Sequence, residues 1–136
     1  MKLSHSLVLI PFLLVLFSCV SKTCEGIIVD IYNGLDHNLD LTFQCKSKDG
    51  SGDVGVHVLH FNQRYTFSFQ RTATSLYTCS FRWDQSGIHW YDVFKPDDAC
   101  SGCLWRITAQ GPCLFNGDTG QYDLCKQWKI NGKLHD

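Results

Sequence analysis

Cysteines and histidines are the residues of this chain whose types and spacing could carry chemistry. Eight cysteines occur among 136 residues, and Cys100 and Cys103 form a C-x-x-C sequence. In a reducing compartment such a pair is typical of a redox site or of half a zinc site, and Cys113 and Cys125 could supply the other half. In an oxidising compartment all four form structural disulfides. We favour disulfides over zinc binding and redox chemistry, because the second pair is not spaced like a zinc knuckle.

The N-terminal segment predicts that the chain enters an oxidising compartment. A basic start is followed by an apolar run, Leu7 to Phe17, and then by small and polar residues from Ser18 to Thr23, which is the order of a secretory signal. The run has about 11 residues, fewer than the roughly 20 of a spanning helix. We therefore expect a signal peptide over residues 1–21, a single secreted, extracellular domain over residues 22–136, and no membrane insertion after cleavage.

The cleavage site leaves alternatives open. Cleavage after Ser21 gives a mature chain with seven cysteines, an odd number that leaves Cys24 unpaired. Cleavage after Gly26 leaves six cysteines but lies far from the apolar run. Leu16 to Cys19 loosely resembles a bacterial lipidation box, which Phe17 fits poorly, so a lipoprotein is the remaining alternative.

Histidines and acidic pairs could act as general bases or metal ligands. The histidines considered are His37, His57, His60 and His89. None lies in a recognisable catalytic motif, and His57 is on the polar phase beside Val56 and Val58, which predicts a solvated side chain. The adjacent Asp97 and Asp98 project divergently and lack the spacing of a calcium loop. We therefore predict no catalytic residue, no metal site and no cofactor.

Charge and aromatic content narrow the classes of partner. The net charge of −1 gives no basic stripe for nucleic acid. Trp83, Trp105 and Trp128 share the phase of other apolar residues and are expected in the core. Trp90 has no clear phase. If one aromatic side chain is exposed for binding, we expect it to be Trp90 or Tyr91.

The elements that carry these residues are predicted to be strands, because apolar and polar residues alternate in short runs separated by Gly, Asn and Asp. The clearest runs are 39–46, 65–69, 77–83 and 103–109. Further strands are expected at Ile27 to Tyr32, Val54 to Leu59, Ile88 to Phe94, and in a terminal hairpin of Leu114 to Phe115 with Gln121 to Trp128. The pattern predicts an all-β fold, an antiparallel β-sandwich of about eight strands stapled by disulfides. A closed barrel is the alternative.

The terminal hairpin predicts one disulfide from geometry. The midpoint between Cys113 and Cys125 is residue 119, inside the turn sequence NGDTG. Cross-strand β-carbons lie roughly 4.5–5.5 Å apart, close to the separation that a disulfide bridges. We therefore predict a Cys113–Cys125 disulfide. Cys100 and Cys103, three apart in an extended chain, point in opposite directions, so each is expected to have a distant partner.

Four fragments carry a family resemblance. They are Val29 to Asn33, LTFQCKSKDGSGDVGVHVL from Leu41, FSFQRTATSLYTCSFRW from Phe67, and Tyr91 to Phe94 followed by CSGCLWRITAQG from Cys100. With these fragments in this order and spacing, the chain from about Ile28 to Trp128 resembles the plant self-incompatibility protein family, the secreted S-protein homologues. The resemblance implies a small extracellular β-sandwich that acts as a recognition ligand.

Some features depart from the family pattern. Cys113 and Cys125 are additional to the usual four cysteines, residues 60–63 replace a glycine-containing turn, and no Asn-x-Ser/Thr sequence occurs. The family-like cysteines are Cys45, Cys79, Cys100 and Cys103, which allow three connectivities. We favour Cys79 with Cys100 and Cys45 with Cys103, because the first pair encloses a hairpin and its short exit.

The function predicted from these observations is recognition. We expect a monomeric ligand for a cell-surface receptor protein, with contacts made by inter-strand loops. The loops are Asp84 to Gly87 and Lys95 to Ala99, and the contact residues expected in and beside them are Asp84, Gln85, Asp97, Asp98, Trp90 and Tyr91. The alternatives are a small secreted hydrolase or ribonuclease that uses histidines, and a lectin-like or toxin-like effector. Two exposed histidines side by side would favour the enzyme, and an exposed tryptophan beside paired acids would favour the lectin.

Overall fold

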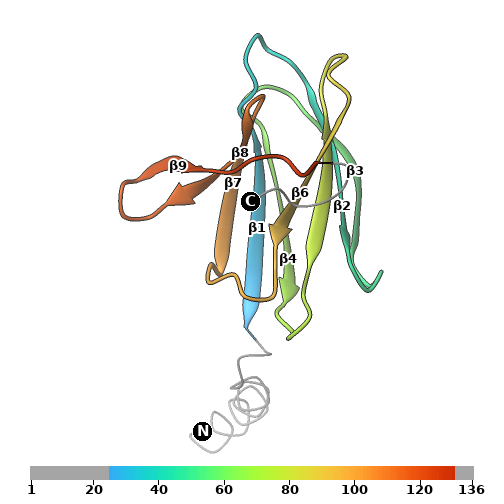
Figure 1. Ribbon diagram of the computed structural model, residues 1–136, viewed down its shortest axis with the longest axis vertical. Coiled ribbons are helices and arrows are strands. Elements are labelled where there is room, and N and C mark those ends of the chain that lie inside the picture. The colour runs from blue at the N-terminus through green and yellow to red at the C-terminus, as the bar shows by residue number, and fades with distance from the viewer. Residues whose placement is uncertain (1–24, 131–136) are drawn as a thin grey trace, which may run out of the picture.

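The computed structural model describes residues 25–130, which form nine strands in two sheets packed face to face (Figure 1). The strands are β1 (Gly26–Asn33), β2 (Leu41–Ser47), β3 (Asp53–Leu59), β4 (Arg64–Gln70), β5 (Tyr77–Arg82), β6 (Ile88–Phe94), β7 (Gly102–Thr108), β8 (Gly111–Asn116) and β9 (Gln121–Cys125). The expected β-sandwich is confirmed. The signal peptide, its cleavage site, the lipidation-box alternative and Cys24 lie outside the described residues. Within residues 25–130, no helix is long and apolar enough to span a membrane.

The strand order gives two separate ladders and not a closed barrel. One sheet has the order β4-β1-β7-β8-β9 and the other β3-β2-β5-β6. All strand pairs are antiparallel except β1 with β7, which run parallel. The expectation of a purely antiparallel sandwich is therefore corrected at this pair. β1 and β7 are far apart in sequence, so no tight turn constrains their relative direction.

The core lies between the sheets, and it is formed by every second side chain of the strands, as the alternation predicts. Phe43 of β2 and Phe81 of β5 stack with their ring centroids 6.2 Å apart, and both side chains are buried. Full burial of such a side chain contributes about 1.5–3 kcal/mol. Trp105 of β7 crosses between the sheets and donates its indole N–H to the carbonyl oxygen of Val93 in β6, at 3.0 Å. The expected core positions of Trp83 and Trp105 are confirmed, and Trp128 is half-buried against the core.

The phase of β3 is the reverse of the one expected. His57 points inward, where its ring stacks on Tyr65 with centroids 4.0 Å apart, while Val56 and Val58 point to solvent. Gly55 has a φ of 83° beside a β-bulge, and Leu59 is buried at the end of the strand. Because side chains alternate with a period of two, the inward Leu59 places His57 inward as well. The prediction of a solvated His57 is wrong.

Three disulfides occur among the described residues. Cys113 and Cys125 are paired across the β8–β9 hairpin, as predicted. The other pairs are Cys45–Cys79 and Cys100–Cys103, so the favoured pairing of Cys79 with Cys100 and of Cys45 with Cys103 is wrong.

Strand order and a bend in the chain explain these two pairs. Cys45 and Cys79 lie directly opposite each other on adjacent strands β2 and β5. Cys100 precedes β7, which begins at Gly102, so the chain between Cys100 and Cys103 is not extended. Their Cα atoms are 5.4 Å apart, within the range that a disulfide spans.

The segment after β9 returns to the four-stranded sheet. The backbone N–H of Lys126 donates to Pro112, and that of Lys129 donates to the carbonyl oxygen of Trp90 on β6. Trp128 packs against Phe81, with ring centroids 5.5 Å apart. The strand expected from Gln121 to Trp128 therefore ends at Cys125, because the remaining residues cover the edge of β6.

Candidate recognition surface

Large apolar side chains are exposed on the outer face of the four-stranded sheet. Val56 and Val58 of β3 and Ile88 of β6 are each more than half exposed, and Trp90 of β6 is 40% exposed. The strands between them, β2 and β5, contribute polar side chains. We define the outer patch as the surface of Thr42, Gln44, Val56, Val58, Ser80, Arg82, Ile88 and Trp90.

Strand register arranges the outer patch in two rows. One row consists of Val58, Thr42, Arg82 and Ile88, and the next consists of Val56, Gln44, Ser80 and Trp90. Each row therefore has an apolar side chain at either end and two polar side chains in the middle. Exposed apolar side chains gathered in this way are typical of surfaces that bind another macromolecule.

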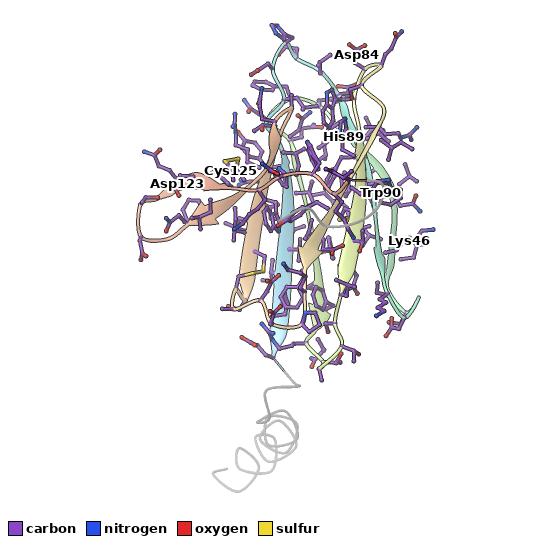
Figure 2. All side chains as sticks on the ribbon, in the orientation of Figure 1. Lys46, Asp84, His89, Trp90, Asp123 and Cys125 are labelled. Carbon is purple, nitrogen blue, oxygen red and sulfur yellow. A yellow bond between two sulfur atoms is a disulfide. The ribbon has the colours of Figure 1, made fainter. Side chains whose placement is uncertain are left out.

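Two shallow hollows follow the outer patch toward the β5–β6 turn. One of about 200 Å³ lies over the middle of the sheet, and one of about 370 Å³ extends to the turn. Thr42, Arg82 and Ile88 line both hollows. The patch and the turn thus form one continuous surface, which reaches Asp84 at the tip of the turn (Figure 2).

Arg82 is the central charge of the outer patch. Its guanidinium group forms no ion pair or hydrogen bond with other side chains in residues 25–130. Asp40, which lines the larger hollow, is instead paired with His60 at 2.8 Å. Arginine binds carboxylates through two parallel hydrogen bonds, and Arg and Trp are frequent energetic centres of interfaces. The patch can therefore bind a surface that combines apolar side chains with a carboxylate.

His89 supports the β5–β6 turn from beneath. Its ring stacks on Trp83 with centroids 4.3 Å apart, and its Nε2 lies 3.3 Å from the hydroxyl of Ser86. Burial lowers the pKa of His89 below its usual value. A neutral imidazole at neutral pH suits this stacked position.

The two loops expected to bind a partner lie at opposite ends of β6. Asp84 and Gln85 belong to the turn before the strand, whereas Asp97 and Asp98 follow it (Figure 1). Seven residues of β6 separate the two loops by ~20 Å. They do not form one compact site, and only the β5–β6 turn adjoins the outer patch.

Asp98 is occupied by contacts within its own loop. Its Oδ2 accepts the backbone N–H of Lys95 at 2.8 Å, and its carbonyl oxygen accepts a hydrogen bond from Arg71 at 2.6 Å. Asp97 is exposed. Asp98 therefore shapes the loop, and Asp97 is the carboxylate that the loop presents to solvent.

Trp90 and Tyr91 differ in exposure. Tyr91 is 5% exposed and packs edge-to-face on Trp105, with ring centroids 5.2 Å apart. Trp90 faces solvent on the outer patch. The expected exposed aromatic is therefore Trp90, and the expectation for Tyr91 is corrected, because its side chain lies on the core side of β6.

Three of the histidines in residues 25–130 lie in separate surroundings. His57 stacks on Tyr65, His60 pairs with Asp40 and His89 stacks on Trp83. No hydrogen bond or ring stacking joins two of the described histidines, and no group of three or more His, Cys, Asp or Glu in these residues could hold a metal. The paired acids Asp97 and Asp98 are also remote from Trp90.

The sequence alone does not point to most of the outer patch. It predicts Trp90, but it gives no reason to expect Val56, Val58, Ile88 or Arg82 there. Val54, Val56 and Val58 alternate with Gly55, His57 and Leu59. Both phases of β3 thus contain apolar residues, and the sequence offers no local signal that selects the inward one.

Comparisons with known proteins identify the family. A sequence model of the family described as plant self-incompatibility protein S1 matches residues 28–128. S-protein homolog 2 of Arabidopsis thaliana is 39% identical over 110 residues, which cover 74% of this chain and 66% of that protein. S-protein homolog 29 of the same plant is 28% identical over 136 residues, covering 92% and 98%.

A solved structure shows the same fold. It is that of a self-incompatibility protein homologue (SPH), from a family described as widespread, small, highly stable, secreted proteins from plants. The two structures align with a TM-score of 0.58 and 21% sequence identity. The alignment covers 81% of this chain and 100% of the solved chain. With the family match over residues 28–128 and this fold, the chain belongs to the plant self-incompatibility S1 family of small secreted S-protein homologues.

Proposed function

We propose that this secreted protein is a recognition ligand that binds a cell-surface receptor protein through the outer patch and the adjoining β5–β6 turn. The observation that carries the proposal is the set of four exposed apolar side chains around Arg82, whose guanidinium group has no partner in residues 25–130. Desolvating such side chains favours association, and Arg82 would select a partner with a carboxylate.

The outer face of the other sheet supports this choice by contrast. There Asp30 is buried, and its carboxylate pairs with Arg64 at 3.1 Å and accepts a hydrogen bond from Thr66 at 3.0 Å. Arg64 also lies over the ring of Tyr32 at 4.9 Å. These charged and aromatic side chains already have partners within the protein, so they offer less to a second molecule.

A matched pair of substitutions tests the location. Ile88 is 55% exposed on the outer patch, and Ile28 is 49% exposed on the outer face of the five-stranded sheet. Ile88→Ser should weaken binding of the labelled protein to cells of the producing plant by about tenfold. Ile28→Ser should change it less than about twofold, and both variants should keep similar melting temperatures. Equal losses of affinity, or none for Ile88→Ser, would contradict the proposal.

The loops are tested in the same assay. Asp84→Ala and Gln85→Ala should weaken binding, since the β5–β6 turn adjoins the outer patch. Asp97→Ala should leave binding unchanged if the patch alone is the contact, and a loss would extend the contact to the opposite end of β6. Protease treatment of the cells should abolish binding. Binding that survives protease but is lost after glycan removal would instead support a lectin-like role.

The domain is also expected to lack hydrolytic and nucleolytic activity and to be a monomer. The Ser86 hydroxyl lies 3.3 Å from His89 Nε2 but donates to the carbonyl oxygen of Trp83, and within residues 25–130 no carboxylate pairs with His89 to orient its ring for general-base catalysis. The purified protein assayed against RNA, peptide and glycoside substrates should equal the blank. Activity abolished by substituting one histidine would overturn this expectation, and light scattering would test the monomer.

A further inference from the structure

The Cys100–Cys103 disulfide closes far less of the chain than the other two. Its cysteines are 3 positions apart in the sequence, against 12 positions for Cys113–Cys125 and 34 for Cys45–Cys79. The stabilisation that a disulfide provides by constraining the unfolded chain increases with loop length. The C-x-x-C disulfide is therefore the one that the fold needs least, which makes it a candidate for exchange chemistry.

The two sulfur atoms of this disulfide differ in access. Cys103 is buried at the start of β7, whereas Cys100 is partly exposed and lines a pocket of about 280 Å³. Cys103 is not among the residues that line the pocket, whose apolar wall is formed by Tyr91, Trp105 and Leu114. A thiol entering the pocket thus reaches Cys100 and not Cys103, which makes Cys103 the leaving group of an attack from this side.

The pocket also has positive charge to offer an anion. Lys95 and Lys126 line it, and neither is paired with a carboxylate within residues 25–130. Of the two aspartates in the lining, Asp92 is paired with Lys129 at 3.0 Å, and Asp98 accepts the backbone N–H of Lys95. Asp98 keeps its negative charge, so three lysines, Lys95, Lys126 and the Lys129 paired with Asp92, face two aspartates. The excess of one positive charge favours an anionic thiol beside Cys100.

We propose that the Cys100–Cys103 disulfide is an exchange site for a low-molecular-weight anionic thiol of the glutathione type, which forms a mixed disulfide at Cys100. The thiolate of the small molecule forms a new S–S bond to the Sγ of Cys100 as the bond to Cys103 breaks. The bonding electron pair leaves with the Sγ of Cys103, which takes up the proton that the attacking thiol released. No other oxidant or reductant is consumed, because one disulfide and one thiol are exchanged for another disulfide and thiol.

The protein can accommodate the leaving sulfur. The Sγ of Cys103 lies 3.4 Å from the carbonyl oxygen of Cys100, a distance at which the new thiol can donate a weak hydrogen bond. The product therefore places a protonated Cys103 in its buried position, close enough to Cys100 to displace the small thiol again. The modification is reversible for this reason.

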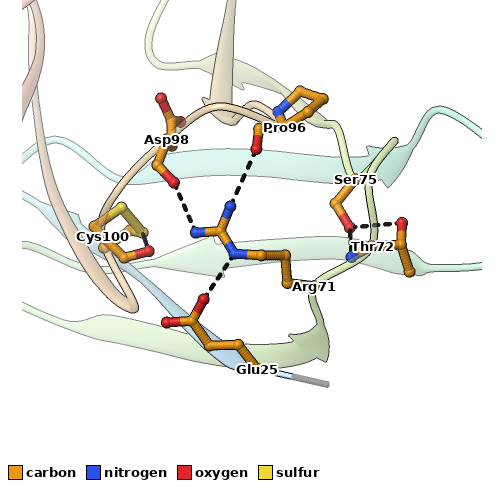
Figure 3. Close-up of polar contacts among 8 residues, drawn as sticks. Glu25, Arg71, Thr72, Ser75, Pro96, Asp98 and Cys100 are labelled. Atoms are coloured by element: carbon orange, nitrogen blue, oxygen red, sulfur yellow. Dashed lines mark hydrogen bonds and ion pairs between the residues drawn. A yellow bond between two sulfur atoms is a disulfide. The ribbon is translucent and has the colours of Figure 1, made fainter. Parts of the chain in front are cut away.

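Arg71 keeps the loop in place when the disulfide opens (Figure 3). Its guanidinium group donates to the carbonyl oxygens of Pro96 at 3.1 Å and Asp98 at 2.6 Å, and its Nε pairs with Glu25 at 2.8 Å. These contacts tie the loop immediately before Cys100 to the start of β1 without the disulfide. Opening is thus a local event that leaves the sandwich folded.

The test uses the oxidised, full-length secreted protein and glutathione as the probe. After incubation at increasing glutathione concentrations, free thiols are trapped with N-ethylmaleimide, and every cysteine is assigned by peptide mass mapping. Glutathione should appear on Cys100 and N-ethylmaleimide on Cys103, at glutathione concentrations at least tenfold below those that open Cys113–Cys125. That disulfide is the matched control because Cys125 is also exposed. Opening of Cys113–Cys125 first or together, glutathione on Cys103, or no opening would each overturn the proposal.

The charge of the pocket gives a second readout. Lys126→Gln should slow the reaction with glutathione about two- to fivefold and leave the reaction with uncharged 2-mercaptoethanol nearly unchanged. Lys46→Gln, at an exposed position on β2 (Figure 2), is the control and should alter neither rate. Equal slowing with both thiols, slowing by the control substitution, or no slowing by Lys126→Gln would show that the pocket does not select an anionic thiol.

Discussion

The Cys45–Cys79 and Cys100–Cys103 disulfides lie in very different regions of the molecule. Cys45 and Cys79 are both fully buried, lie on the central strands of the four-stranded sheet, and close a separation of 34 residues. Cys100 lies beside a pocket at the end of a loop and is bonded to a residue three positions away. In the chain-entropy relation these separations correspond to about 4 and about 1.6 kcal/mol of stabilisation. One disulfide thus holds the core together, and the other holds a loop end that Arg71 already anchors.

Removal of the core disulfide should have the largest effect. Cys45→Ala with Cys79→Ala should lower the free energy of unfolding by about 4 kcal/mol, because it releases the longest loop. The melting temperature should fall by at least about 10 °C. Calorimetry of the secreted double variant measures this, and a loss below about 2 kcal/mol would break the contrast between the two regions.

The hairpin disulfide should rank second. Cys113→Ala with Cys125→Ala opens a separation of 12 residues, for which the same relation gives about 3 kcal/mol. Part of that figure is offset if the β8–β9 hairpin persists in the unfolded chain. In urea unfolding, the stability of this variant should lie between those of the Cys45/Cys79 and Cys100/Cys103 double variants. Any other order would show that loop length does not determine how much each disulfide stabilises the protein.

Arg71→Met should lower stability by about 2 kcal/mol, since two hydrogen bonds from a charged donor and one ion pair are removed. Methionine can retain the packing on Phe94, over whose ring the guanidinium group lies at 4.9 Å. Hydrogen exchange of residues 95–99 should accelerate while exchange in β2 and β5 stays slow. Unchanged exchange in the loop would mean that the disulfide, and not Arg71, holds Cys100 in place.

Removal of the Cys100–Cys103 disulfide should lower stability least among the three. Cys100→Ala with Cys103→Ala should lower the free energy of unfolding by about 1.5 kcal/mol. Binding of the labelled protein to cells should be unaffected, since the pocket shares no lining residue with the outer patch. A loss of stability that matches the Cys45 and Cys79 variant would contradict both the comparison and the exchange proposal.

The smallest expected effect is the contribution of His89 to the pH dependence of stability. Burial lowers the folded-state pKa of His89 below the value of 6.5 that applies to the unfolded chain. The unfolded state therefore binds more protons, so this contribution to stability is complete above pH 6.5 and is lost as pH falls below it. His89→Phe keeps a ring against Trp83, and its melting temperature should fall less than that of the parent between pH 7.5 and 5. An equal fall would assign the pH response to other groups.

Local pattern predicted much of the fold because alternation reports which side of a strand is apolar. It located β2, β5 and β7 and their buried residues, such as Phe43, Phe81 and Trp105. It failed at β3, where His57 is inward and Val56 outward. At that strand both phases contain apolar residues, and only stacking on Tyr65 and the position of Leu59 decide between them.

The family, the secreted sandwich, the burial of Trp83 and Trp105 and the Cys113–Cys125 pair can all be predicted from the sequence, because each depends on residues close together in the chain or on fragments in a fixed order. Tertiary structure decided which distant strands are neighbours. The adjacency of β2 and β5 selects Cys45–Cys79, and the register across β3, β2, β5 and β6 brings Val56 into one row with Trp90. Both the core staple and the outer patch depend on contacts between strands that no local turn connects, and such contacts are set by packing of the whole domain and not by alternation within a strand.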